Sequence, residues 1–79
     1  MTDVHIPKMG MSTIEVDILK VLIAPGDRVT AGQSVVEIES EKANYEVEAG
    51  VAGTVTEVLV SEGDICEVGD IVARIEEDG

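Results

Sequence analysis

The sequence predicts an all-β fold in which two small sheets pack face to face about a pseudo-twofold axis. The first observation is composition: 13 Val and 8 Ile stand against 3 Leu, and β-branched residues suit pleated, half-buried strands. The second is that no apolar pattern of helical period runs for longer than a turn. The third is an internal duplication, which predicts two similar halves.

The duplication appears when the chain is shifted by 37 residues, which lays residues 17–39 over residues 54–76. Eight of the 23 aligned positions are identical: Val21/Val58, Leu22/Leu59, Gly26/Gly63, Asp27/Asp64, Gly32/Gly69, Val35/Val72, Ile38/Ile75 and Glu39/Glu76. A single repeat indicates one duplicated half, because a solenoid needs three or more units. No linker divides the 79 residues, so we expect one domain over residues 1–79.

Both halves show the same order of elements: strand, Gly-Asp turn, short strand, glycine turn, strand. Residues 1–16 precede the first half, and we expect a first strand within a few residues of Met1. The glycines of the four turns are expected to supply conformations that branched residues avoid; they are Gly26, Gly32, Gly63 and Gly69. Asp27 and Asp64 are expected to accept hydrogen bonds from backbone amides in their turns.

Residues 35–48, "VEIESEKANYEVEA", alternate apolar and acidic side chains on both sides of a short break, which predicts a hairpin outside the duplication. A two-residue turn at Glu-Lys pairs Ile38 with Tyr45. A turn at Lys-Ala pairs Ile38 with Val47 instead, and both registers keep the two faces separate. In either register Lys42 lies in the exposed turn.

The outer face of this hairpin gathers acids. The first register places Glu37 directly opposite Glu46, and like charges across a ladder destabilise a sheet by some tenths of a kcal/mol. Folding alone gives no reason for this arrangement. Two explanations stay open: a partner surface that matches the acids, or protection of a sheet edge against aggregation.

The formal net charge of −12 argues against nucleic acid and against anionic membrane surfaces as partners. No window approaches the roughly 20 apolar residues of a membrane span, and no signal peptide precedes the first strand. A single cysteine excludes an internal disulfide and fits a reducing compartment. We expect a monomeric domain in a bacterial cytoplasm, or in the mitochondrial matrix if a transit peptide is missing.

The sequence gives almost no support for catalysis by the chain itself. The chain has one histidine, His5, and one cysteine, Cys66, and it shows no Ser-His-Asp set and no metal-binding cluster. Cys66 overlays Val29 in the repeat, which indicates a small core residue. Lys42 is beside Glu41, which favours the charged lysine, a poor nucleophile. From residues alone, Lys42 is either an ordinary surface lysine or an accessible point for acylation.

Between residues 6 and 75 the chain contains the segments "IPKMGM", "PGDRVTAGQSVVEIE", "SEKANYEVEA", "GTV", "EGD" and "VGDIVARIE". Through these segments it resembles the lipoyl domain of the acyltransferase subunits of 2-oxo acid dehydrogenase complexes. The resemblance implies a flattened barrel of two four-stranded antiparallel sheets. It also implies that (R)-lipoate is attached covalently to Lys42, and that the lipoylating enzyme recognises Glu41 and Ala43.

The resemblance further implies a swinging arm that shuttles acyl groups and electrons between active sites. Its implied partners are a thiamine-diphosphate-dependent decarboxylase or dehydrogenase, an acyltransferase core, dihydrolipoamide dehydrogenase, and a lipoate ligase or lipoyl/octanoyl transferase. Partner choice is expected to involve the segment Met9, Gly10, Met11, Ser12 and Thr13. The chain departs from the family at Glu41, where aspartate is usual, and over residues 12–16. The sequence does not indicate which 2-oxo acid or acetoin complex it serves.

Two alternative functions remain. A biotin carrier domain has the same fold, but methionine usually stands on both sides of its lysine, where this chain has Glu41 and Ala43. An unmodified barrel-sandwich module used only for contacts lacks a tip lysine in this context. The lipoylated carrier of glycine cleavage is a longer chain whose extra helices do not fit within 79 residues.

Overall fold

The computed structural model describes residues 1–7, 15–40 and 43–78. These residues form eight β-strands: β1 (Thr2–His5), β2 (Glu15–Val21), β3 (Arg28–Val29), β4 (Ser34–Glu39), β5 (Asn44–Glu48), β6 (Gly53–Val58), β7 (Ile65–Glu67) and β8 (Ile71–Glu77). All the strand pairs are antiparallel. The predicted all-β class is confirmed.

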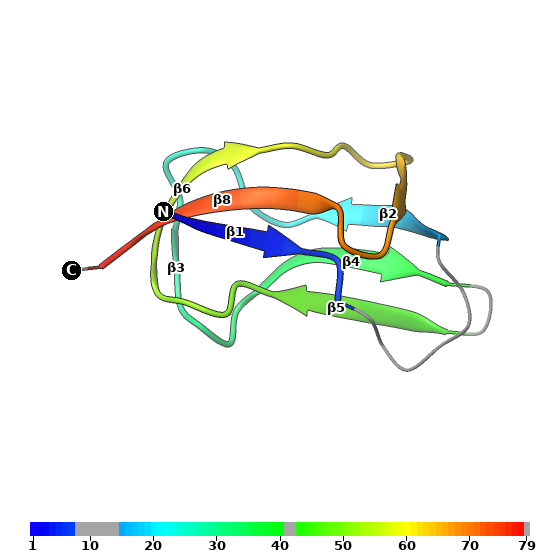
Figure 1. Cartoon of the computed structure of the whole chain (residues 1–79), viewed down its shortest axis with the longest axis horizontal. Coiled ribbons are helices and arrows are strands. Elements are labelled where there is room, and N and C mark those ends of the chain that lie inside the picture. The colour runs from blue at the N-terminus through cyan, green and yellow to red at the C-terminus, as the bar shows by residue number, and fades with distance from the viewer. Residues whose placement is uncertain (8–14, 41–42, 79) are drawn as a thin grey trace.

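The strands form two four-stranded sheets that pack on each other as two layers (Figure 1). One sheet, called here the terminal sheet, has the order β1-β8-β6-β3. The other, called the hairpin sheet, has the order β5-β4-β2-β7. The two chain ends lie close together at one end of the molecule, and β4 runs toward the opposite end, where β5 begins (Figure 1).

The two halves of the duplication exchange their short strands. Strands β2 and β4 of the first half lie in the hairpin sheet with β7 of the second, and β6 and β8 lie in the terminal sheet with β3 of the first. Equivalent backbone hydrogen bonds join the halves: Gly26 N–H donates to the Val55 carbonyl over 2.7 Å, and Gly63 N–H donates to the Ile18 carbonyl over 2.8 Å. The pseudo-twofold relation predicted from the repeat is therefore present in the hydrogen-bonding pattern.

The Gly-Asp turns are also equivalent. The Asp27 carboxylate accepts a hydrogen bond from Ala24 N–H at 2.9 Å, and the Asp64 carboxylate accepts one from Ser61 N–H at 2.8 Å. Each carboxylate thus satisfies a backbone donor that the turn would otherwise leave to water. The expected role of the two acids is confirmed.

The glycine expectation holds at three of its four positions. Gly26, Gly63 and Gly69 have φ values of 96°, 89° and 95°, in the region that a Cβ atom disfavours. Gly32 does not have a positive φ, so the expectation is wrong there. The turn at Gly32 is closed by the amide of Gln33, whose N–H donates to the Thr30 carbonyl, and it needs no left-handed residue.

The core between the sheets is thin and almost wholly aliphatic. The molecule measures 37 × 22 × 16 Å, so one layer of side chains from each sheet fills the interior. The buried side chains are Val4, Ile6, Val16, Ile18, Ile23, Val29, Val35, Val36, Ile38, Val47, Ala49, Val55, Cys66, Val72, Ala73 and Ile75. Cys66 and Val29, which the repeat overlays, are both in this core, so the core assignment of Cys66 is confirmed.

Candidate functional site

The β4–β5 hairpin adopts the first of the two predicted registers. Ile38 lies opposite Tyr45, and Glu37 lies opposite Glu46. The alternative pairing of Ile38 with Val47 is therefore wrong. Because Glu39 pairs with Asn44, the chain between the two strands consists of residues 40–43 alone.

The base of the turn is closed by Ser40 and Ala43. Ser40 N–H donates to the Ala43 carbonyl over 2.8 Å, and the Ser40 hydroxyl donates to the same oxygen over 3.1 Å. Ser40 is 7% exposed and is the buried polar side chain among the residues that the structure describes. Sequence reasoning missed this residue. Its only signal was a serine immediately before the predicted turn.

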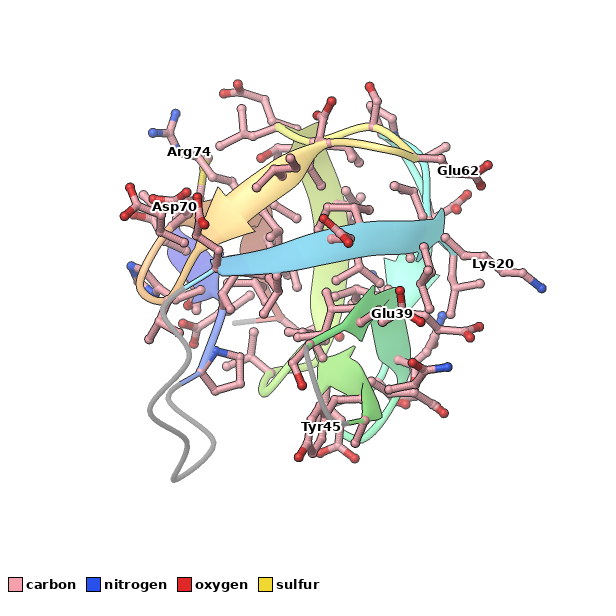
Figure 2. All side chains as sticks on the ribbon, turned by 90° about the vertical axis from the view of Figure 1, so that its right-hand side faces the viewer. Lys20, Glu39, Tyr45, Glu62, Asp70 and Arg74 are labelled. Atoms are coloured by element: carbon pink, nitrogen blue, oxygen red, sulfur yellow. The ribbon has the colours of Figure 1, made fainter. Side chains whose placement is uncertain are left out.

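The described end of the hairpin lies beside the start of β2, where Glu39 of β4 is opposite Asp17. Viewed from that end, the Glu39 and Tyr45 side chains lie on the neighbouring strands β4 and β5 (Figure 2). The side chain of Lys20, on β2, extends outward to one side (Figure 2). Tyr45 is half-buried and packs against the core, so it ties the hairpin to the body of the domain.

Most of the site residues predicted from sequence lie outside the described residues. Ala43 is described, and it is exposed beside the turn that it helps to close. Glu41 and Lys42 lie outside the described ranges, as do Met9, Gly10, Met11, Ser12 and Thr13. The structure therefore describes the two strands that flank the turn, and the turn residues Ser40 and Ala43.

The electrostatic character of the two sheets differs. On the terminal sheet, Arg74 lies 3.3 Å from both Asp3 and Glu57, and Arg28 lies 2.7 Å from Asp78, so both arginines are matched by acids. The hairpin sheet instead pairs acids with acids at three places, Glu37 with Glu46, Asp17 with Glu39, and Glu15 with Glu67, while Lys20 lies opposite Glu37. Its outer face is therefore strongly negative, which favours association with basic surfaces and disfavours anionic ones.

Cys66, on β7, is one of the residues that line an open hollow. The hollow is lined by Leu59, Val60, Asp64, Ile65, Cys66, Asp70 and Ile71. Burial raises the pKa of the Cys66 thiol, and the carboxylates of Asp70 and Asp64 raise it further. A thiol held in its neutral form is a poor nucleophile and a poor metal ligand, so Cys66 serves packing.

The described residues offer little other chemistry. In residues 1–7, 15–40 and 43–78, no cluster of three or more His, Cys, Asp and Glu side chains is placed to hold a metal ion. Within the same ranges, no helix is long and apolar enough to span a membrane.

The decisive comparison is with protein families. Residues 2–75 match the biotin/lipoyl family, whose description is "Biotin-requiring enzyme". The chain belongs to this family. Within it, the chain is a carrier domain of the lipoyl type, and a carrier domain has no catalytic role of its own.

The curated relatives that this carrier domain matches include acyltransferase components. It is 38% identical over 92% of its length to the lipoamide acyltransferase component of the branched-chain alpha-keto acid dehydrogenase complex of Bacillus subtilis. It is 39% identical over 94% of its length to the dihydrolipoyllysine-residue acetyltransferase component of the pyruvate dehydrogenase complex of Corynebacterium glutamicum. The chain spans only 17% and 11% of these two relatives.

Solved structures show the same fold. The lipoyl domain of the 2-oxoglutarate dehydrogenase complex of Azotobacter vinelandii matches with a TM-score of 0.73 and 26% identity, over 96% of this carrier domain and 99% of that chain. A region of the Kluyveromyces lactis urea carboxylase matches with a TM-score of 0.78 and 33% identity, over 95% of the domain and 6% of that enzyme.

Proposed function

We propose that Lys42 is the attachment point of a lipoyl group and that the domain presents this group as a swinging arm. The observation that carries the proposal is the hairpin register. Because Ser40 pairs with Ala43, Glu41 and Lys42 are the whole connection at the tip of a hairpin. Lys20 lies within β2, so of these two lysines Lys42 is the one that the two-stranded support would present to a modifying enzyme.

The described residues around the turn are compatible with an attached lipoyl group. Ile38 of β4 is fully buried, and Tyr45 of β5 packs against the core. Both strands of the hairpin are therefore anchored to the body of the domain. Ala43 is a small, exposed neighbour that leaves room for an enzyme to enclose the turn. When bound, a lipoyl group would supply a dithiolane that accepts acyl groups and electrons, and the protein would supply its position and its recognition.

We further propose that the domain is part of an acyltransferase component of a 2-oxo acid dehydrogenase complex. The two relatives described above and a third, from Staphylococcus saprophyticus, are components of three different complexes of this class, so the proposal concerns the class. The partners would be the decarboxylating dehydrogenase, the acyltransferase core and dihydrolipoamide dehydrogenase, in the cytoplasm or the mitochondrial matrix. The negative outer face of the hairpin sheet would favour basic docking surfaces on these partners.

The test is the intact mass of the domain after incubation with lipoate, ATP and a lipoate ligase. The ligase would join the lipoate carboxylate to the Lys42 amine as an amide, with ATP cleaved to AMP and pyrophosphate. We expect one lipoyl increment, located by peptide mapping on the peptide that holds Lys42. The matched variants are Lys42→Arg, which should fold normally and remain unmodified, and Lys20→Arg, which should be modified like the wild type. Modification of Lys42→Arg, or its loss in Lys20→Arg, would contradict the assignment.

Biotin is the second candidate, and two observations favour it. The family description names biotin-requiring enzymes, and a carboxylase contains a region of the same fold. Glu41 and Ala43 stand against it, because biotinylated lysines of this family usually lie between methionines. A parallel incubation with biotin, ATP and a biotin protein ligase distinguishes the two, and we expect no biotin increment.

A further inference from the structure

Ser40 makes a contact that the fold itself does not demand. Its backbone N–H already closes the hairpin on the Ala43 carbonyl, over 2.8 Å. Its hydroxyl adds a second donor to the same oxygen, over 3.1 Å. Ser40 is 7% exposed and this hydrogen bond is partly buried, so water competes with it less than at an open surface.

The tip of this hairpin needs such a contact, because its turn sequence is unfavourable. Two-residue hairpin loops prefer Asn-Gly or Asp-Gly, whose residues adopt positive φ, and this loop is Glu-Lys. The competing register, in which Ile38 faces Val47, keeps the apolar and acidic faces separate equally well. The pairing along β4 and β5 fixes the register in the structure, so closure of the tip itself is what the turn sequence leaves weakly held.

We propose that Ser40 is a positioning residue for the modification of Lys42. By donating twice to Ala43, it keeps the last described pair of the hairpin closed, in the register that β4 and β5 already fix. A modifying enzyme then encounters Lys42 on a hairpin that keeps one conformation. Without the hydroxyl, the tip opens more often, and only the closed fraction is recognised. This inference rests on the proposed function of Lys42.

The same hairpin offers a matched control. Ser34 lies at the far end of β4, and its hydroxyl donates to the Glu46 carboxylate over 2.8 Å. Ser34→Ala and Ser40→Ala thus each remove one hydroxyl hydrogen bond from the same pair of strands. Only Ser40→Ala removes it next to Lys42. A general loosening of the hairpin would affect both variants alike.

The experiment measures lipoylation of wild type, Ser40→Ala, Ser40→Thr and Ser34→Ala by a lipoate ligase with lipoate and ATP, over a range of domain concentrations. Since a hydrogen bond contributes about 0.5–1.5 kcal/mol net, removing the Ser40 hydroxyl should raise the opening constant about two- to twelvefold. Exchange of the Ser40 backbone amide, followed by NMR, reports that constant directly. For Ser40→Ala we expect exchange to accelerate by this factor. We expect KM for the domain to rise by up to the same factor, with kcat unchanged.

The remaining variants decide the cause. Ser40→Thr keeps the hydroxyl and should restore both KM and the exchange rate, and Ser34→Ala should keep the wild-type KM. An unchanged KM in Ser40→Ala, or an equal rise in Ser34→Ala, would overturn the inference while leaving the lipoyl assignment intact. If the wild type itself is not modified, the proposed function fails and this inference fails with it.

Discussion

Among the glycines that the structure describes, Gly53 is the one at which an added Cβ atom would clash with its neighbours. It begins β6, between Val29 of β3 and Glu77 of β8. A Cβ atom added there would lie 2.1 Å from the backbone oxygen of Glu76 and 2.9 Å from Cγ2 of Ile75. A backbone oxygen held in a ladder has no rotamer to move to, so Gly53→Ala must push β6 and β8 apart.

Overpacking of a well-packed interior costs about 1–3 kcal/mol, and occasionally more. We place Gly53→Ala at about 3 kcal/mol, the upper end of that range, because the obstacle is backbone. In a domain of this size, 1 kcal/mol corresponds to about 4–8 °C in Tm, so we expect a loss of about 12–24 °C. Such a loss is a large part of the stability that a small domain has.

The assay is thermal and urea unfolding followed by circular dichroism, with Gly32→Ala as the matched control. At Gly32 a Cβ atom would meet nothing within 4 Å, and the φ is not positive. Gly32→Ala should therefore equal the wild type or exceed it by up to about 1 kcal/mol. A Gly53→Ala variant within about 0.5 kcal/mol of the wild type would refute the steric reasoning.

Three further predictions concern conformation, charge and the thiol. Gly26→Val should cost about 1–3 kcal/mol in urea unfolding, because its φ of 96° is strained for a branched residue; an unchanged midpoint would contradict this. Asp17→Asn should stabilise by about 0.2–1 kcal/mol by removing a like charge opposite Glu39, and a gain that persists undiminished at about 1 M salt would exclude this cause. Native Cys66, whose pKa burial raises, should react with iodoacetamide far more slowly than in urea. Since the folded state holds this proton more tightly, stability is full below the unfolded thiol pKa of about 8.5 and falls as pH rises through the folded pKa.

Much of the fold was open to prediction because its determinants are local or periodic. The excess of Val and Ile, the absence of a helical period and the repeat at 37 residues together predict two sheets built from two similar halves. The Gly-Asp turns carry their own chemistry, so Asp27 and Asp64 were assigned from sequence and behave as expected. The alternation in residues 35–48 predicts a hairpin with Lys42 at its tip.

Other features depend on contacts between distant segments, which periodicity does not encode. Two hairpin registers separate the faces equally well, and the tertiary structure selects the one that pairs Ile38 with Tyr45. The turn at Gly32 looked equivalent to that at Gly69, yet only Gly69 has a positive φ.

The sequence by itself determined the fold class, the two halves and the hairpin around residues 40–43, because residue type and spacing act along the chain. Only the tertiary structure decided the exchange of β3 and β7 between sheets, the close approach at Gly53 and the burial of Ser40. Each of these depends on which strand becomes the neighbour of which. That choice is made by packing of the whole core and not by any single segment.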